Sequence, residues 1–388
     1  MSGVVDPRVL VVIDKFKGTL TAAEAATCVA AGFRSVFPNM RIDTFPLADG
    51  GEGSSAIAGE AIGAQRVELE VCGPHGEPVR GFYYRKNGKA LIELAAASGL
   101  VLVDKTSGRS ACSATTFGFG QLIRHAVENG ATEIQLFLGG SASTDGGIGF
   151  AKALGARFFD ARGDLIPGPT GDEPYAGERL GDVARIELSE LHERLGNVSI
   201  VAAVDVDNPL CGENGCAAIY GPQKGLTPTL IPVIDGHLSR IAKLVSKTID
   251  RNYADVPGAG AAGGSGFGVL AFLNGRLVPG SDFFLDLIEF ERLAKEADYV
   301  ITGEGKIDSQ SLSGKLLSAI CKRCEKLQRP VIAFGGILGL TPEELGQYPQ
   351  LRAFGLGRDD CLTKTELSLS CVVGQVASLM ALVRKVDQ

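Results

Sequence analysis

The sequence predicts an α/β protein with two domains, in which a doubly wound parallel-sheet domain is split by an inserted mixed α/β domain. Strand-like and helix-like segments alternate from Val9 to Gly63, and the same alternation returns after Asp298. This order is typical of a parallel sheet covered by helices. Between the two stretches lie short strand-like runs joined by turn signals, as in antiparallel strands. The chain has 388 residues, which is more than one domain usually takes.

The elements expected at the start of the chain follow one another in β-α-β-α order. The first strand is an apolar run typical of a buried parallel strand. The first helix is expected to begin after Thr21, because Thr21 and Glu24 have the spacing of a capping box. The expected elements are Val9–Ile13, Ala22–Phe37, Arg41–Leu47 and Ser54–Gly63.

The middle of the chain has a different pattern. The dipeptide Asn87-Gly88 is a hairpin signal between two strand-like runs. The stretch Asp160–Asp182 is polar and rich in glycine and proline, so we expect a loop there. Expected strands are Gln65–Cys72, Val79–Arg85, Lys89–Leu94, Glu133–Leu138 and Val198–Val204, and expected helices are Phe119–Glu128, Gly149–Leu154 and Pro232–Thr248.

The last part of the chain returns to alternating strands and helices. Expected elements are Tyr299–Thr302, Gly314–Leu327, Val331–Phe334, Pro342–Leu345, Leu351–Leu356 and Leu367–Val386. We assign residues 1–66 and 282–388 to one Rossmann-like or flavodoxin-like domain, and residues 67–281 to the inserted domain. The active site is expected in the cleft between the two domains.

Composition narrows the classes of partner. A formal net charge of −7 argues against a surface for nucleic acid or anionic membrane. Nine cysteines without regular spacing favour reduced thiols in the cytoplasm. The N-terminus has no signal-peptide pattern, and we expect no apolar stretch long enough to span a membrane. A small-molecule substrate is expected; whether the chain forms a homo-oligomer stays open.

The glycine-rich run LGGSASTDGGIG, Leu138–Gly149, follows an expected strand and precedes an expected helix. Glycines allow backbone N–H groups to converge, and a helix N-terminus adds partial positive charge, so such a turn suits phosphates. Asp145 is a candidate Mg²⁺ ligand; the alternative is that it only caps the helix. The phosphate-binding candidates are Gly139, Gly140, Ser141 and Ser143.

Two further acidic motifs follow expected strands, at the sheet edge where ligands of α/β proteins bind. ADGGEG, Ala48–Gly53, offers Asp49 as a base or Mg²⁺ ligand, and helix capping is the alternative. DVDNPLC offers Asp205 for a metal or a hydroxyl, with an Asx turn before Pro209 as the alternative.

A third acidic motif, TGEGKIDSQSLSGK, compresses acids and lysines into one run that begins with an expected strand and a glycine turn. Gly303 and Glu304 are candidates for cofactor binding and Asp308 for metal. Lysine near a transferring phosphoryl group offsets its charge, which makes Lys315 a candidate. A solvated loop that caps the next helix is the alternative.

Other motif matches carry less weight. GAGAAG, Gly258–Gly263, has the spacing of a dinucleotide-binding motif, but no strand is expected before it. No Walker A sequence occurs, and Cys321 and Cys324 form a lone CxxC in a helical pattern, where packing is the default. A nicotinamide-linked dehydrogenase and a non-catalytic sensor remain as alternative functions.

Taken in order, the motifs resemble those of bacterial type I glycerate kinases, from Val9 to the last helix. The motifs that carry the resemblance are DKFKGTLTAAEAA, PLADGGEG, ELAAASGL, LGGSASTDGG, DVDNPLCG, YGPQKG, PGAGAAGG and TGEGKIDSQSLSGK. The resemblance implies one Rossmann-like domain split by another, with ATP and Mg²⁺. It also implies D-glycerate as acceptor and 2-phosphoglycerate as product, with the 3-phosphate or a related hydroxy acid as alternatives.

Within that resemblance, residue type suggests individual roles. Asp205 or Asp49 would accept the proton of the glycerate hydroxyl, and Lys17 or Lys315 would offset negative charge. Three positions depart from the family pattern and bear on acceptor choice, namely Lys15, Phe119 and Gln121.

Overall fold

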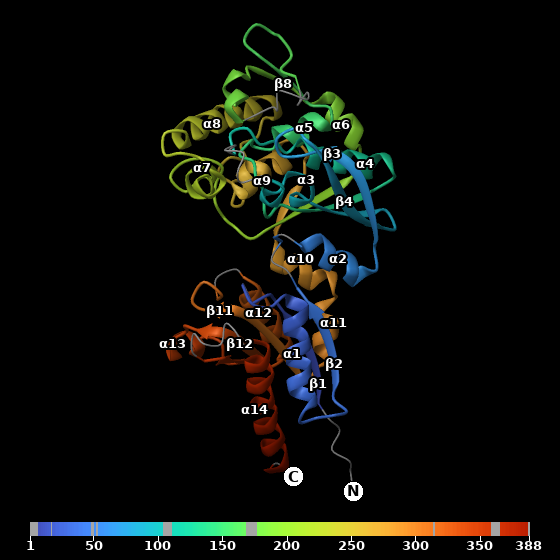
Figure 1. Ribbon diagram of the computed structural model, residues 1–388, viewed down its shortest axis with the longest axis vertical. Helices are drawn as coiled ribbons and strands as arrows, with labels where there is room; N and C mark the ends of the chain where they lie inside the picture. Colours follow the sequence, from blue (N-terminus) through green and yellow to red (C-terminus); the bar gives the residue numbers. More distant parts are fainter. Residues whose placement is uncertain are drawn as a thin grey trace. The chain divides into compact units, whose positions relative to one another are not determined.

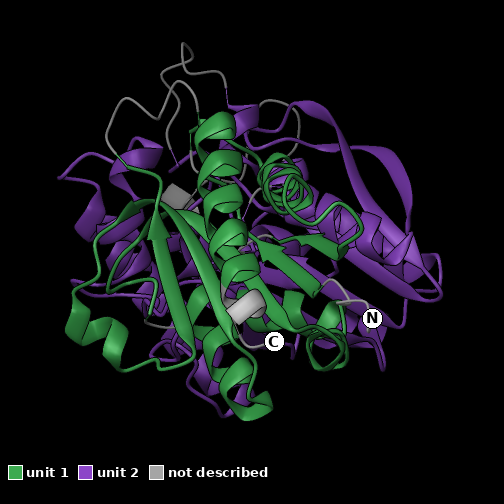
Figure 2. Cartoon of the chain, turned by 90° about the horizontal axis from the view of Figure 1, so that it is seen from below, with its two compact units in different colours: residues 1–49, 281–388 green, residues 50–280 purple. Residues whose placement is uncertain are grey.

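The computed structural model describes residues 7–16, 18–47, 50–51, 53–103, 111–167, 177–312, 315–357 and 365–386. It divides into two compact units (Figure 2). Unit 1 holds residues 1–49 and 281–388, and unit 2 holds residues 50–280. Both units combine helices with largely parallel sheets, which confirms the α/β class.

The sheet of unit 1 is parallel throughout, in the order β13-β12-β11-β1-β2. Its strands are β1 (Arg8–Ile13), β2 (Arg41–Pro46), β11 (Tyr299–Ile307), β12 (Val331–Leu338) and β13 (Leu351–Gly355). Read along the chain, this is the 2-1-3-4-5 order of flavodoxin-like sheets. The predicted doubly wound sheet is therefore confirmed, although its strands come from both ends of the chain.

Four of the six described helices of unit 1 begin within two residues of their predicted starts, and the two between residues 280 and 296 were not predicted. Thr21 and Glu24 form the predicted capping box, since the Thr21 N–H donates to Glu24 Oε2 at 2.8 Å and Glu24 N–H donates to Thr21 Oγ1 at 3.2 Å. Thr341 and Glu344 form a second one. The helices are α1 (Ala22–Arg34), α10 (Gly280–Leu287), α11 (Phe290–Glu296), α12 (Leu316–Leu327), α13 (Pro342–Gly346) and α14 (Thr365–Val386).

Helix α14 corrects the expectation about apolar segments. Over Thr365–Leu382 it is long and apolar enough, by length and composition, to cross a membrane, the one such helix among the described residues. It also packs closely on α1, because a Cβ on Gly32 would lie 2.7 Å from the Ser370 carbonyl oxygen. Within α14, Leu369 and Val373 are buried in the core of unit 1, whereas Leu367, Leu379 and Leu382 are exposed.

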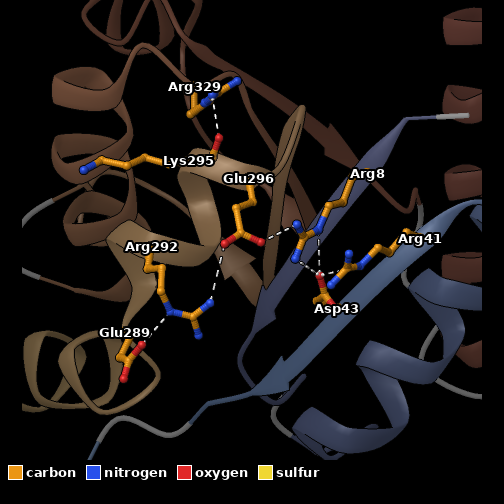
Figure 3. Close-up of polar contacts among 8 residues, drawn as sticks. All are labelled: Arg8, Arg41, Asp43, Glu289, Arg292, Lys295, Glu296 and Arg329. Atoms are coloured by element: carbon orange, nitrogen blue, oxygen red, sulfur yellow. Dashed lines mark hydrogen bonds and ion pairs between the residues drawn. The ribbon is translucent and has the colours of Figure 1, made fainter. Parts of the chain in front are cut away.

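A network of charges ties the first two strands of unit 1 to α11 (Figure 3). Arg8 pairs with Asp43 at 2.8 Å and also with Glu296. Arg292 bridges Glu289, at 2.6 Å, and Glu296, at 3.6 Å. Arg8 opens β1 and Asp43 lies on β2, so this network anchors the start of the sheet, away from its carboxyl ends.

Unit 2 contains a mixed sheet in the order β10-β9-β6-β5-β4-β3, and Figure 1 labels its strands β3 and β4. Pairs β3–β4 and β4–β5 are antiparallel and the others are parallel. Asn87 and Gly88 both have positive φ, as a tight hairpin requires, so that turn is confirmed. The strands are β3 (Gln65–Cys72), β4 (Pro78–Lys86), β5 (Lys89–Glu93), β6 (Glu133–Phe137), β9 (Ser199–Val204) and β10 (Arg276–Pro279).

Several short elements of unit 2 were missed from sequence, namely β7 (Arg157–Phe159), β8 (Arg185–Glu187), α3 (Ala95–Ser98), α6 (Ser189–Leu195), α7 (Cys216–Tyr220) and β10. Each is so short that it shows little periodicity. In the expected loop Asp160–Asp182, a 3₁₀ turn occupies Gly177–Asp182. The other helices are α2 (Ser54–Ile62), α4 (Phe117–Glu128), α5 (Ile148–Ala153), α8 (Ile231–Ile249) and α9 (Ala261–Ala271), with 3₁₀ turns at Leu100–Leu102 and Pro222–Lys224.

The units divide after Asp49, whereas the sequence suggested residue 66. Helix α2 accounts for this difference. A Cβ on Gly59 would lie 2.7 Å from the ring of Tyr84 on β4, so the helix lies directly against the sheet of unit 2. The β-α-β-α pattern at the start of the chain therefore spans both units.

Candidate functional site

The carboxyl ends of three neighbouring parallel strands of unit 2 carry three of the quoted motifs. On β6, Phe137 pairs with Glu93 at the end of β5 and with Ala203 near the end of β9. The segments that follow these strands are Leu94–Gly99, Leu138–Gly147 and Asp205–Cys211. Parallel strands end at the same edge of a sheet, so the three segments meet where α/β proteins bind ligands.

Close glycine contacts bring two more motifs to this edge. Gly139 N–H donates to the Gly50 carbonyl at 3.3 Å, and a Cβ on Gly139 would lie 2.4 Å from Gly51 Cα. Gly146 N–H donates to the Gly263 carbonyl at 3.0 Å. We call these five segments the loop cluster: Gly50–Gly51, Leu94–Gly99, Leu138–Gly147, Asp205–Cys211 and Gly258–Gly264.

Asp145 lies at the centre of the loop cluster and is fully buried. Its Oδ2 accepts hydrogen bonds from the N–H and the hydroxyl of Thr116, both at 2.8 Å, and from Gly149 N–H at 3.2 Å. Its Oδ1 accepts from Gly147 N–H at 3.1 Å. Burial raises the pKa of Asp145, and the bonds from Thr116 and the two glycines oppose that rise. The carboxylate thus joins the loop to the start of α4.

This arrangement changes two expectations for the run Leu138–Gly149. All four recorded partners of Asp145 are donors from the chain, so the geometry favours the capping alternative over a metal ligand. The cradle is also smaller than expected, because two of its N–H groups are engaged. Gly139 donates to Gly50, and Ala142 donates to the Ser98 carbonyl at 2.9 Å. Gly140, Ser141 and Ser143 remain as phosphate-binding candidates.

Lys224 is a buried cation under the same loop. Its Nζ donates to Ser141 Oγ at 2.6 Å and to the Ser143 carbonyl at 2.7 Å. Burial lowers the pKa of Lys224 to about 8, while Cys216 and Asp145 act in the opposite direction. A positive charge directly beneath a glycine-rich loop suits an anionic ligand on that loop.

Buried hydroxyl groups without a protein partner also gather in this region. Ser143 Oγ, Thr144 Oγ1 and Ser98 Oγ are buried and have no hydrogen-bond partner. Leaving such a group unpaired costs about 1–3 kcal/mol, so each needs a water or a ligand. Ser98 belongs to Leu94–Gly99, which runs beside the glycine loop, since Leu100 N–H donates to the Gly140 carbonyl at 2.8 Å.

Glu93 holds the start of α2, next to the Gly50–Gly51 segment. Its carboxylate accepts from Gly53 N–H at 2.8 Å, Ser55 N–H at 3.1 Å and Ser55 Oγ at 2.9 Å. A carboxylate at a helix N-terminus is favoured by the helix dipole. Glu93 therefore occupies the anion site that this helix would otherwise offer to a phosphate.

Of the four residues predicted to be catalytic, the structure describes Asp205 and Lys315. Asp205 is exposed directly after β9, and the pairing of Phe137 with Ala203 places it near Gly139. Asp49 and Lys17 lie outside the described residues, so the structure does not bear on their roles.

In the motif TGEGKIDSQSLSGK, the structure has a strand where the sequence predicted a glycine turn. Residues 303–307 continue strand β11, and Gly303 pairs with Phe334 on β12. A Cβ on Gly303 would lie 2.5 Å from the Phe334 carbonyl oxygen, so this glycine serves close strand packing. Burial raises the pKa of the neighbouring Glu304, which the Ser311 hydroxyl and Lys315 oppose.

The two remaining predicted residues of this motif lie at its end. Asp308 pairs with Lys306 at 2.9 Å, and its Oδ1 accepts from Gln310 N–H at 3.0 Å. That hydrogen bond from Lys306 holds the pKa of Asp308 below its usual range. Asp308 is thus part of a turn with its own cation, in line with the solvated-loop alternative. Lys315 is exposed where α12 begins.

The described residues contain no group of three or more histidine, cysteine or acidic side chains placed to hold a metal ion. A protein cage is not needed for Mg²⁺, which is often held by one or two carboxylates and the phosphates of a substrate. Asp145 and Asp308 each bond to donors of the chain. Asp205 is exposed at the loop cluster.

Two of the three departures from the family pattern are structural. Phe119 is buried and packs edge to face on Phe150, with ring centroids 5.8 Å apart. The Gln121 side chain accepts from Cys72 N–H at 2.7 Å. Lys15, the third of these residues, is half-buried after β1.

Other motifs have packing roles. GAGAAG is not preceded by a strand, and a Cβ on Gly263 would lie 2.0 Å from the Ser143 carbonyl oxygen, so it supports the glycine loop. Cys321 and Cys324 are buried in α12, and burial raises the pKa of both thiols to about 12.

Sequence reasoning missed Glu93, Thr116 and Lys224 as members of the site. Glu93 lies in ELAAASGL and Lys224 in YGPQKG, two motifs that the resemblance already contains. In the sequence, the sign that Glu93 and Lys224 belong to the site was a charged residue next to alanines or a glycine in a quoted motif. Their partners lie far along the chain, so spacing alone did not connect them.

Comparison with known proteins gives a consistent result. A model of the glycerate kinase family matches residues 9–379. Glycerate kinase from Bacillus subtilis is 42% identical and glycerate 2-kinase from Escherichia coli is 40% identical, each over 88% of this chain and 88% of its own length. A solved structure from Salmonella typhimurium LT2, described as a candidate glycerate kinase 2, has a TM-score of 0.82 and 34% identity, covering 98% of this chain and 100% of that one.

Proposed function

The chain belongs to the glycerate kinase family, and we propose that it transfers the γ-phosphoryl group of ATP to a hydroxyl of D-glycerate, giving ADP and 2-phosphoglycerate. The family match over residues 9–379 carries this proposal. It is supported by the relatives named glycerate kinase and glycerate 2-kinase. The loop cluster supplies what such a reaction needs, namely a glycine-rich anion site over a buried cation.

In this proposal the phosphates of ATP bind on the loop around Gly140, Ser141 and Ser143. Asp145 acts on the loop and does not touch the substrate, because its four bonds fix the turn into α5. Phosphoryl transfer depends mainly on positioning and on charge stabilisation, so a rigid loop with a cation beneath it matches its demands.

Asp205 is the described residue that we propose as general base for the acceptor hydroxyl. It is exposed at the carboxyl end of β9, beside the glycine loop. Mg²⁺ bound with ATP would neutralise charge on the phosphates, and the same carboxylate could hold it. Lys17, Asp49 and Lys315 stay as proposed contributors, on residue type alone.

The acceptor half of the proposal rests on the family. Phe119 and Gln121 have structural roles, so two of the three reasons to expect another acid lose their force. A related small hydroxy acid and the 3-phosphate product remain the alternatives. The eight cysteines among the described residues form no disulfide with one another, in line with a cytoplasmic location.

An ADP-release assay with D-glycerate tests the function, with erythronic and tartronic acids as competing acceptors. We expect turnover with D-glycerate to exceed turnover with the other acids. ATP binding without acceptor-dependent ADP release would instead favour the sensor alternative. No ATP binding, together with NADH binding by fluorescence, would favour the dehydrogenase.

Replacement of Asp205 tests its proposed role as general base. Asp205→Asn should lower kcat by about 10²–10⁴, the usual effect of losing a general base. Asp164→Asn, an exposed aspartate elsewhere in unit 2, is the matched control and should leave kcat unchanged. A decrease of less than tenfold in folded Asp205→Asn would remove this residue from the mechanism.

A further inference from the structure

We propose that Lys224 orients the hydroxyl of Ser141 so that this hydroxyl donates its proton to the anion on the glycine loop. Lys224 is then a positioning residue, which acts on ATP through Ser141. This inference rests on the proposed function, because that function places the phosphates of ATP on the loop. The sequence indicated neither Lys224 as a member of the site nor the direction of its hydrogen bond to Ser141.

The contact between Lys224 and the loop is direct. Lys224 Nζ lies 2.6 Å from Ser141 Oγ and 2.7 Å from the Ser143 carbonyl oxygen. The Lys224 side chain is buried, with 7% of the residue exposed, and Ser141 is 5% exposed. Burial of an ammonium group is costly unless it is well bonded, so this geometry is strongly determined.

The chemistry of the two groups fixes the direction of the bond. An ammonium group has three donor protons and no acceptor. Ser141 Oγ must therefore accept from Lys224, and its own proton has to point to another acceptor. A serine that already accepts from a cation is a stronger donor, because hydrogen bonds in a chain polarise one another. Phosphate oxygens are acceptors of the kind that such a hydroxyl suits.

The backbone around Lys224 holds its side chain in place. The Lys224 carbonyl accepts from Ala111 N–H at 2.9 Å, and Lys224 N–H donates to the Gly221 carbonyl at 2.9 Å. Gly221 in turn packs on α7, where a Cβ would lie 2.2 Å from the Ala217 carbonyl oxygen. Lys224 is therefore presented to the loop from a short, tightly packed turn.

The charge of Lys224 can change near physiological pH. Burial lowers its pKa to about 8, and the titratable groups that face it are Cys216 on α7 and Asp145 on the loop. Burial raises the pKa of the Cys216 thiol to about 12, so this thiol stays neutral. Once Lys224 loses its proton, Nζ can accept, and the Ser141 proton is free to turn toward it. The donor to phosphate is then lost.

Calorimetric titration with ATP and Mg²⁺ between pH 7.5 and 9.5 tests the inference. The terminal phosphate is already ionised over this range, so ATP itself changes little. For the wild-type protein we expect the Kd for ATP to rise severalfold above pH 8. Ser141→Ala should raise Kd about tenfold at pH 7.5, as expected for a lost bond to a charged group, and should remove most of the pH dependence.

Three variants complete the experiment. Lys224→Met should raise Kd about as much as Ser141→Ala, and the double variant should bind no more weakly than either, because both remove one hydrogen bond. Lys247→Met, an exposed lysine on α8, is the control and should bind ATP like the wild type. Thermal unfolding identifies any variant that does not fold, and Ser141→Ala alone then carries the test.

The inference is overturned if Ser141→Ala binds ATP as tightly as the wild type, or keeps the same rise of Kd above pH 8. It is also overturned if the effects of the two single variants multiply in the double variant. The proposed function is tested separately by glycerate-dependent ADP release in the wild type. Turnover with unchanged ATP binding in Ser141→Ala would reject the inference and keep the function.

Discussion

Asp145 accepts both the backbone N–H and the hydroxyl of Thr116 on one carboxylate oxygen, at 2.8 Å each. Thr116 precedes α4, and Asp145 ends the glycine loop that precedes α5. The Thr116 hydroxyl also accepts from Phe150 N–H at 3.0 Å. Two residues that lie 29 positions apart thus fix the loop between two helices. The structure assigns Asp145 to holding the loop, a role that does not require contact with a metal.

Replacement of Asp145 tests this role. In Asp145→Asn, the amide N–H₂ group would face donors from Thr116 and Gly149, so at least one buried donor loses its partner. We expect the free energy of unfolding to fall by about 3 kcal/mol. Urea unfolding measures this change. Asp164→Asn is the matched control on the surface of unit 2, and an equal effect in both variants would contradict the role of Asp145.

Glu93 provides a second prediction. In Glu93→Gln one acceptor oxygen becomes a donor, and it would face the N–H groups of Gly53 or Ser55. We expect a loss of stability of about 1–3 kcal/mol and a lower kcat/KM, because the start of α2 adjoins the glycine loop. Glu193→Gln, an exposed glutamate on α6, should behave as the wild type. Unchanged unfolding and kinetics in Glu93→Gln would remove Glu93 from the site.

Two glycines of unit 2 should respond to alanine in opposite directions. Gly263 has a φ of +68°, and an added Cβ would lie 2.0 Å from the Ser143 carbonyl oxygen. Gly263→Ala should therefore destabilise the fold and weaken ATP binding. Gly236 lies in α8 with open space around it, so Gly236→Ala should stabilise by about 0.5–1 kcal/mol. Thermal unfolding of both variants checks the pair, and shifts of the same sign would refute it.

Lys224 should leave a signature in the dependence of stability on pH. Burial lowers its pKa in the folded protein to about 8, below the value of 10.5 of an exposed lysine. Between these values the unfolded chain binds a proton that the folded chain does not, so the free energy of unfolding should rise with pH. Below pH 8 both states are protonated, and the full cost of burying the charge is present.

Urea unfolding at pH 8 and pH 10, for the wild type and for Lys224→Met, isolates this contribution. All other groups titrate in both proteins, so the difference between their slopes reports Lys224. The variant should lack part of the rise seen in the wild type. Parallel slopes would show that Lys224 is not a buried titrating cation.

Much of the fold could be predicted because local patterns decided it. The capping box at Thr21 and the hairpin at Asn87-Gly88 rest on a few adjacent residues, and both formed as expected. The placement of LGGSASTDGG after β6 and of DVDNPLC after β9 was also right. Parallel pairing then brought the motifs to one edge.

What the sequence did not reveal depends on long-range contacts. The glycines of TGEG read as a turn, yet they continue β11, because close pairing with β12 excludes a side chain at Gly303. The sequence made Asp145 a candidate Mg²⁺ ligand, and its hydrogen-bond donors in the structure are Thr116 and two glycines of the run Leu138–Gly149. Lys224 and Ser141 lie 83 positions apart, and no spacing rule relates them.

The most direct test of the central claim is phosphorus NMR of the product formed by the wild-type protein from ATP and D-glycerate. We expect a phosphate ester whose phosphorus couples to a single carbon-bound proton, as in 2-phosphoglycerate. Coupling to the two protons of a methylene group would indicate the 3-phosphate and correct the regiochemistry. Inorganic phosphate alone, or no glycerate-dependent change, would contradict the assignment of this chain as a glycerate kinase.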